Sequence, residues 1–151
     1  MSNPHRLFGL LGAAALLLVA FGSAATPSYA KDGDIRFRCK AKGPSQIALH
    51  ARYEERARPR GLRQKFGAEF EARPGGSFNS GQQVSIVVDT IPVGNVTLTL
   101  APSGELSAQL EFDSKPGNGH TLFPPNFPDV GAGSMVEAKV GTNTILGCEL
   151  Q

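Results

Sequence analysis

The chain has 151 residues, a formal net charge of +2 and no tryptophan. Without tryptophan, and with Tyr53 as the only tyrosine beyond residue 30, a carbohydrate site built on an aromatic platform is disfavoured. The chain also lacks the G-x-S-x-G, H-E-x-x-H, phosphate-loop and EF-hand motifs, which argues against the enzymes and calcium sensors that depend on them.

Residues 1–30 have the organisation of a secretory signal peptide. A short segment with positive charge and no acid precedes the apolar run Leu7–Phe21, and Ser28-Tyr29-Ala30 places small residues where signal peptidase cleaves. Cleavage after Ala25 is an alternative. The run is shorter than the roughly 20 residues that cross a bilayer, so we expect a removed leader rather than a membrane anchor. The predicted product is a periplasmic or extracellular protein of one domain, residues 31–151, that does not span a membrane.

Apolar and polar residues alternate along most of the exported part, which is the pattern of β-strands with one solvent-facing side. The alternation recurs in about eight short segments: Ile35-Phe37-Cys39, Ile47-Leu49-Ala51-Tyr53, Phe66-Ala68-Phe70-Ala72, Val84-Ile86-Val88, Val96-Leu98-Leu100, Leu106-Ala108-Leu110-Phe112, Val136-Ala138-Val140 and Leu146-Cys148-Leu150. Glycine and proline turns separate them, including one expected at residues 91–94. The pattern predicts an all-β fold, an antiparallel β-sandwich of about eight short strands, with a small β-barrel as the alternative.

The two cysteines lie near opposite ends of the exported part. Cys39 and Cys148 each share the apolar side of their segments, and an even pair in an oxidising compartment favours a disulfide. The bond would close a loop of 148 − 39 = 109 residues. Neither cysteine belongs to a C-x-x-C motif, and only two histidines lie beyond residue 30, so we predict a disulfide rather than a metal site.

Positive charge is concentrated in the first part of the exported chain. Residues 31–73 carry twelve Lys or Arg and six acids, a net charge of +6, whereas residues 74–151 carry two Lys and seven acids, a net charge of −5. The densest basic run lies around a predicted hairpin tip, and its candidate anion-binding residues are Arg56, Arg58, Arg60 and Arg63. One interpretation is adhesion of this hairpin to an anionic envelope polymer or lipid headgroup.

The alternative interpretation of the basic hairpin is pairing within the sheet. With a turn at residues 59–61, Glu54 would lie opposite or diagonal to Lys65, and Glu69 would lie near His50 or Arg52, which is ordinary cross-strand stabilisation. Nucleic acid is not an expected partner, because the chain is exported and has no basic sheet studded with aromatic residues.

Residues 114–134 form a long stretch without strand periodicity, and they contain the segment HTLFPPNFPDV. Loops of this length in compact domains tend to be functional or loosely ordered, and two phenylalanines between prolines argue against a disordered linker. One interpretation is a lid, in which one or both rings cover an open end of the sandwich. The other is a partner-binding surface formed by Phe123, Asn126 and Phe127, with Phe127 the more exposed ring.

Candidate groups for acid–base or metal chemistry are few. His120 with Asp113 or Asp129 would form a small hydrolytic or metal-dependent site, but His120 follows the flexible tip Gly117-Asn118-Gly119. A calcium site that used Asp113, Asn118 and Asp129 would match no known ligand spacing. We therefore expect no catalytic residues, no cofactor and no metal, and keep the His120, Asp113 and Asp129 site as the alternative.

The order of several segments resembles a known kind of domain. KFGAEFEA is followed by VSIVVDTIPVGNVTL, GELSAQLEF, the FP-containing loop with GAGSMVEAKV, and a closing ILGCEL. Over roughly residues 62–151 this order is similar to small uncharacterised β-sandwich domains of secreted bacterial proteins. The resemblance implies a β-sandwich and brings no catalytic residues with it. We expect a non-catalytic exported module that binds an unknown protein or envelope component, or that contributes to envelope structure.

Overall fold

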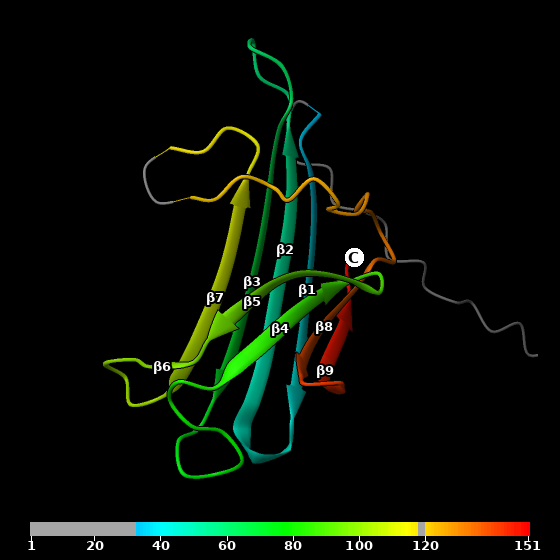
Figure 1. Ribbon diagram of the computed structural model, residues 1–151. Coiled ribbons are helices and arrows are strands. Elements are labelled where there is room, and N and C mark those ends of the chain that lie inside the picture. The colour runs from blue at the N-terminus through cyan, green and yellow to red at the C-terminus, as the bar shows by residue number, and fades with distance from the viewer. Residues whose placement is uncertain (1–32, 118–119) are drawn as a thin grey trace, which may run out of the picture.

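Two antiparallel sheets pack face to face in the computed structural model of the protein, which describes residues 33–117 and 120–151 (Figure 1). The strands of this part are β1 Ile35–Gly43, β2 Ile47–Arg56, β3 Arg63–Ala72, β4 Gln83–Val88, β5 Ile91–Thr97, β6 Thr99–Leu100, β7 Leu106–Asp113, β8 Met135–Val140 and β9 Asn143–Glu149. One sheet has the order β1-β2-β3-β7-β6 and the other the order β5-β4-β8-β9. The predicted β-sandwich is confirmed, and the described strands form no closed barrel.

Alternation along each strand determines which side chains enter the core between the sheets. In β2, for example, Leu49, Ala51 and Tyr53 are buried, and the residues between them point to the outer face. The largest fully buried apolar side chains come from both sheets and their connections: Phe66, Phe70, Leu49, Ile86, Leu98, Leu106, Leu150, Val84, Val88 and Val136. Burial of these side chains stabilises the sandwich and leaves the outer face of the five-stranded sheet to polar residues.

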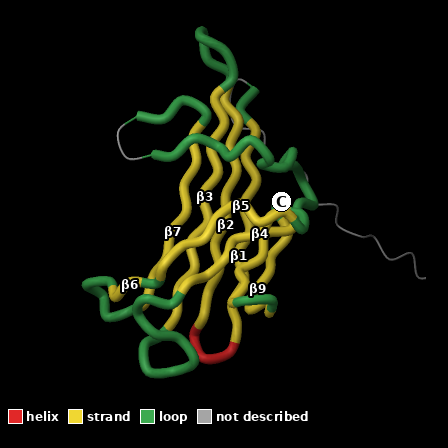
Figure 2. The backbone as a smooth tube through the Cα atoms, in the orientation of Figure 1, coloured by secondary structure: helices red, strands yellow, loops and turns green. Residues whose placement is uncertain are grey.

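The strands of the two sheets differ in length. β2 and β3 have ten residues each, whereas β4 and β8 have six. The four-stranded sheet therefore covers only part of the five-stranded sheet, and residues 120–134 cross the remaining part (Figure 2). Beyond this crossing the β2–β3 hairpin projects from the molecule, and a single 3-10 turn at Pro44–Gln46 joins β1 to β2 at the opposite end.

The connection from β4 to β5 corrects one expectation from the sequence. The predicted turn at residues 91–94 is wrong, because the turn consists of Asp89 and Thr90, whose φ angles are 46° and 74°. Two residues with positive φ match the twist of a β-hairpin. β5 accommodates its proline because it is an edge strand and the β4 pairing is irregular at that point. Leu98 is fully buried as expected, but Leu100 in the edge strand β6 is 60% exposed.

The predicted signal peptide, residues 1–30, lies outside the described residues, so it stays a prediction. Among the residues that the structure describes, no helix has the length and apolar character needed to cross a membrane. Buried residues of both sheets form one hydrophobic cluster, which gives the two sheets a shared core.

Candidate binding surface

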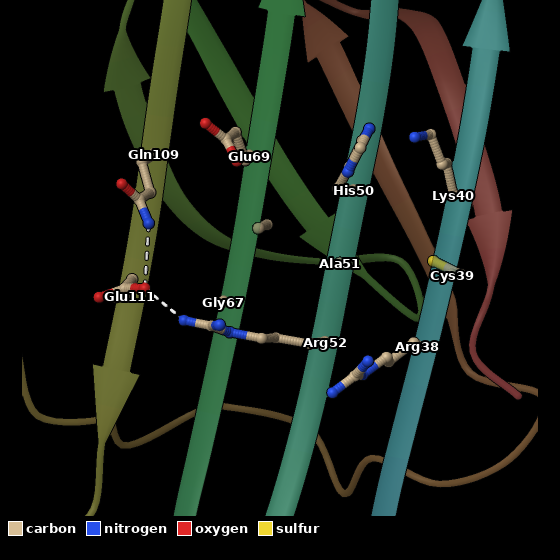
Figure 3. A pocket seen from close by; sticks show the side chains of 11 residues that line it. Arg38, Cys39, Lys40, His50, Ala51, Arg52, Gly67, Glu69, Gln109 and Glu111 are labelled. Atoms are coloured by element: carbon tan, nitrogen blue, oxygen red, sulfur yellow. Dashed lines mark hydrogen bonds and ion pairs between the residues drawn. The ribbon is translucent and has the colours of Figure 1, made fainter.

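The outer face of the five-stranded sheet is hollowed into a groove of about 590 Å³ (Figure 3). The groove crosses β1, β2, β3 and β7, whose antiparallel register aligns their outward residues in rows. One row consists of Arg38, Arg52, Gly67 and Glu111, and the next row consists of Lys40, His50, Glu69 and Gln109. Basic side chains therefore line the β1 and β2 side of the groove, and carboxylates line the β3 and β7 side.

Gly67 forms the floor of the groove, because it is the outward position of β3 that has no side chain. The Arg52 side chain lies across it from β2, and its Nη2 donates a 2.7 Å hydrogen bond to Glu111 Oε1 on β7. A Cβ atom at Gly67 would lie 3.0 Å from Arg52 Nε, so a side chain there requires this arginine to shift, and more so the bulkier the side chain is. Gln109 Nε2 donates to the same Glu111 oxygen at 3.0 Å, and His120 Nδ1 lies 3.3 Å from Glu111 Oε2.

Arg38 and Lys40 line the groove without a carboxylate partner. Both side chains are exposed, and among the described residues no acidic side chain lies within 4 Å of either cation. Arg52, in contrast, is neutralised by Glu111. The groove therefore presents its uncompensated positive charge from β1.

The four arginines of the basic hairpin fall into two groups. Arg56 Nη2 donates a 2.6 Å hydrogen bond to Glu54, and Arg63 donates to Asp113 through both Nε and Nη2. Arg58 and Arg60 are exposed near the tip, with no acidic side chain within 4 Å in the described part of the chain. The four residues are therefore not one free cationic surface.

The predicted cross-strand alternative for this hairpin agrees with the observed register. Glu54 lies opposite Lys65, and His50 lies opposite Glu69, in the β2–β3 pairing. Burial by itself would raise the pKa of the Glu54 carboxyl group, but the hydrogen bond from Arg56 and the charges of Arg56, Arg36 and Arg52 together lower it. Charge on this hairpin therefore contributes to pairing within the fold.

Asp113, at the end of β7, has a structural partner for each carboxylate oxygen. It is fully buried, and it accepts hydrogen bonds from Arg63 and from the backbone N–H of Lys115, while Lys65 Nζ lies 3.3 Å from Oδ2. Hydrogen bonding to Arg63 lowers the pKa of Asp113 far below its ordinary value, and burial opposes this shift only in part. Asp113 therefore remains a carboxylate and cannot act as a general base for a neighbouring group without losing these partners.

The alternative site built on His120, Asp113 and Asp129 is not assembled as a metal centre. His120 contacts Glu111, Asp113 contacts two cations of β3, and Asp129 is exposed. The described residues contain no group of three or more His, Cys, Asp or Glu side chains that could hold a metal ion. Asn118, the remaining oxygen donor of the calcium alternative, lies outside the described residues.

The aromatic residues of the FPPNFP segment pack on the part of the core that the four-stranded sheet leaves open. The centroid of the Phe127 ring lies 5.2 Å from that of Phe66, 5.7 Å from that of Phe112 and 4.7 Å from that of Phe123. The ring centroids of Phe123 and Phe112 are 5.6 Å apart. Both loop residues are partly buried and pack against the core cluster, so the expectation that Phe127 is the more exposed of the two rings stays a prediction. Asn126 is exposed beside them, and the role of the three residues in partner binding stays a prediction.

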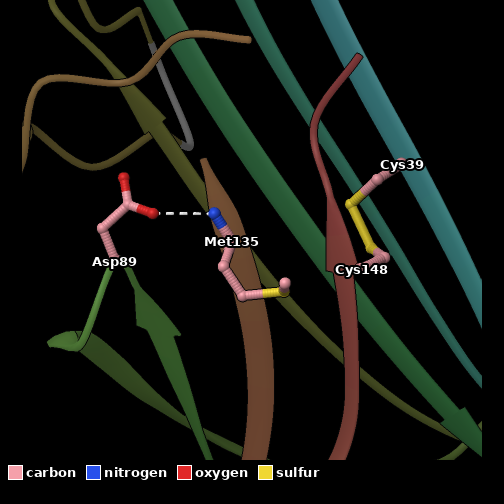
Figure 4. The surroundings of a disulfide bond; sticks show 4 residues. All are labelled: Cys39, Asp89, Met135 and Cys148. Carbon is pink, nitrogen blue, oxygen red and sulfur yellow. Dashed lines mark hydrogen bonds between the residues drawn. A yellow bond between two sulfur atoms is a disulfide. The ribbon is translucent and has the colours of Figure 1, made fainter. Parts of the chain in front are cut away.

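The predicted disulfide between Cys39 and Cys148 is confirmed (Figure 4). The bond joins β1 and β9, which are the edge strands of the two sheets, and both cysteines are half-buried against the core. Beside it, backbone hydrogen bonds connect Arg38 and Gln151 in both directions, at 3.0 and 3.2 Å. The open edge of β1 is therefore covered at its midpoint by the end of the chain.

Comparison with known proteins found no matching protein-family model, no matching characterised protein and no matching solved structure. The groove itself was missed by reasoning from the sequence. The alternating cations of residues 36–42 were a visible signal, but their alignment with Gly67 depends on pairing across four strands.

Proposed function

We propose that the protein is an exported, non-catalytic binding module that holds an anionic ligand in the groove of the five-stranded sheet. The predicted leader and the disulfide support a periplasmic or extracellular location. The observation that carries the proposal is that Arg38 and Lys40 line a concave sheet surface with no acidic side chain within 4 Å among the described residues.

A non-catalytic role is supported by the partners of the candidate acid–base groups. Asp113 is held by Arg63 and Lys65, and the imidazole of His120 lies against Glu111. A general acid or base needs a free geometry toward its substrate, and these side chains are instead engaged with other residues of the fold. The groove offers charge and hydrogen bonding but no paired nucleophile and base.

The test is a titration of the isotope-labelled protein with citrate at low salt, followed by amide NMR. We expect shifts at Arg38, Lys40 and Arg52. Gly67→Thr should weaken this binding severalfold, because its side chain fills the floor of the groove and displaces Arg52. The matched control is Gly76→Thr, which makes the same substitution in an exposed turn where a Cβ atom has room.

Two results would contradict the proposal. Citrate shifts confined to Arg58 and Arg60 would favour the hairpin adhesive instead. An absence of citrate shifts in the groove would favour a structural role in the envelope, in which the sheet face has no ligand. Equal citrate affinity of the Gly67→Thr variant and the native protein would also exclude the groove as the site. Denaturation midpoints of Gly67→Thr and Gly76→Thr equal to that of the native protein would show that both variants are folded.

A further inference from the structure

The cations of β1 form a regular row, which we call the β1 ladder: Arg36, Arg38, Lys40 and Lys42. All four point to the outer face, because they alternate with the inward residues of the strand. A strand rises about 3.4 Å per residue, so neighbouring cations are about 7 Å apart and the row spans about 20 Å. Arg38 and Lys40 line the groove, and Arg36 and Lys42 extend the row of outward cations beyond it in both directions along β1.

Ion pairing separates the β1 ladder from the other cations of this sheet face. Arg52, Arg56, Arg63 and Lys65 each have a carboxylate partner within 4 Å. In the ladder only Arg36 has one, Glu54 at 3.9 Å, while Arg38, Lys40 and Lys42 have none among the residues that the structure describes. The uncompensated charge of the sheet face is therefore arranged along one strand.

Protection of an edge strand is the ordinary explanation for charge on β1, since lysines discourage pairing with another chain. Here the edge is already blocked at its midpoint, because Arg38 exchanges two backbone hydrogen bonds with Gln151 and the adjacent Cys39 is bonded to Cys148. Edge protection therefore does not account for the free cations at the centre of the ladder.

We propose that the groove and the β1 ladder bind a linear acidic polysaccharide, with its acidic groups on β1 and its hydroxyl groups toward β3 and β7. This inference rests on the proposed function and names the class of its ligand. Glu69 and Gln109 lie across the groove from Lys40, and their oxygens can accept hydrogen bonds from sugar hydroxyls. The carboxylates would repel a second row of acidic groups, which confines the charged side of the polymer to β1.

A polysaccharide fits this surface better than a single-stranded nucleic acid does. Binding of bases relies largely on aromatic side chains on which they stack, and no phenylalanine, tyrosine or tryptophan lines the groove. Sugar recognition here would depend on charge and hydrogen bonds along the rows. The polarity of the face, basic on one side and acidic or amide on the other, complements a chain that carries both acidic groups and hydroxyls.

The experiment measures the affinity of the protein for galacturonate, its dimer, its tetramer and its hexamer by calorimetry at low salt. We expect affinity to rise with length until the oligomer spans the ladder, and then to level off. Lys40→Gln and Lys42→Gln should each weaken binding of the hexamer by about two- to fivefold, the range for an exposed ion pair. The matched control, Arg58→Gln on the hairpin tip, should leave the affinity unchanged.

The outcomes separate this inference from the proposed function. If citrate binds in the groove but the affinity for galacturonate oligomers does not depend on their length, the polysaccharide proposal is wrong and the proposed anion-binding function still holds. Equal affinity for polyphosphate of matched charge, or a larger effect of Arg58→Gln than of Lys42→Gln, would overturn the polysaccharide assignment. No binding of citrate or of any oligomer would contradict both proposals together.

Discussion

At the scale of single residues, Asp113 is the most strongly held charge of the described structure. Its side chain is removed from water, yet Arg63, Lys65 and the backbone of Lys115 satisfy its oxygens. Both cationic side chains remain about one-third exposed, at 35% and 36%, so water can solvate them when the carboxylate is lost. The arrangement connects the end of β7 to the base of the β2–β3 hairpin.

We predict that Asp113→Asn lowers the free energy of unfolding by about 2 kcal/mol near neutral pH, because it removes charge-assisted hydrogen bonds to a buried group. The pKa of Asp113 is lowered in the folded state. Its contribution is therefore fully present above the unfolded carboxyl pKa of about 4, and it is lost as the pH falls through the folded pKa. Below about pH 4 the difference between the native protein and the variant should shrink.

Urea denaturation across this pH range provides the measurement, and Asp129→Asn provides the control. Asp129 is exposed, and no cation lies within 4 Å of it among the described residues. Its substitution should change the free energy of unfolding by less than about 0.5 kcal/mol. If Asp113→Asn does not change the free energy of unfolding, or if its destabilisation is the same below about pH 4 as at neutral pH, the ion pairs contribute nothing to stability.

At the scale of elements, the FPPNFP segment covers the part of the core that the strands of the four-stranded sheet do not reach. The six-residue strands of the second sheet end before the ten-residue β2 and β3 do, which would leave Phe66 and Phe112 open to water. Phe123 and Phe127 cover these two rings, and the Phe127 N–H donates to the carbonyl of Pro124 in the turn that places them. The packing favours the lid interpretation for the rings.

We predict that Phe123→Ala and Phe127→Ala each lower the free energy of unfolding by about 2 kcal/mol, less than for a fully buried phenylalanine because both rings are half-buried. Phe127→Ala should cost at least as much as Phe123→Ala, since Phe127 contacts three rings and Phe123 contacts two. Chemical denaturation measures both. Leu122→Ala is the control, because Leu122 is 60% exposed and should be nearly neutral.

If Phe127→Ala leaves stability unchanged while Phe123→Ala does not, the Phe127 ring is free in solution. That result would restore the expectation from the sequence that Phe127 and Asn126 are presented to a partner. Equal losses would leave Asn126 as the exposed polar residue of a structural lid.

At the scale of the whole molecule, the two sheets are joined at one side by the disulfide between β1 and β9 and by backbone hydrogen bonds between β1 and Gln151, which follows β9. The disulfide links residues 109 positions apart, and the Arg38–Gln151 hydrogen bonds lie next to it. A crosslink over a long loop removes many conformations from the unfolded chain. The same closure fixes β1, which carries the ladder, relative to the second sheet.

We predict that reduction lowers the free energy of unfolding by up to about 5 kcal/mol, the chain-entropy value for a loop of this length. Thiol titration of the unfolded, unreduced protein should find no free sulfhydryl, because the two cysteines of the sequence are bonded to each other. The matched control is the double variant Cys39→Ala with Cys148→Ala, whose stability should not respond to a reducing agent. Two free thiols in the unreduced protein would contradict the bond.

The sequence alone determined the fold class, most of the strands, the inward faces of β2, β3 and β7, and the cysteine pair. These features depend on the period of two within single strands, so neighbouring residues encode them. The register of the β2–β3 hairpin could be predicted in part from the sequence, because Glu54 and Lys65 lie on either side of the same turn. The turn at Asp89 and Thr90 was missed because neither residue is the glycine that such turns usually contain.

Only the tertiary structure decided where the groove and the lid are. Gly67 leaves a hollow because Arg52 and Glu111 lie on either side of it, and Glu111 reaches that row through the pairing of β3 with β7. Phe127 packs on the core because the two sheets differ in length, which is a property of their packing and not of the segment itself. The physical reason is the same in both cases: a local pattern fixes which way a side chain points, but the partner that it meets comes from a distant part of the chain.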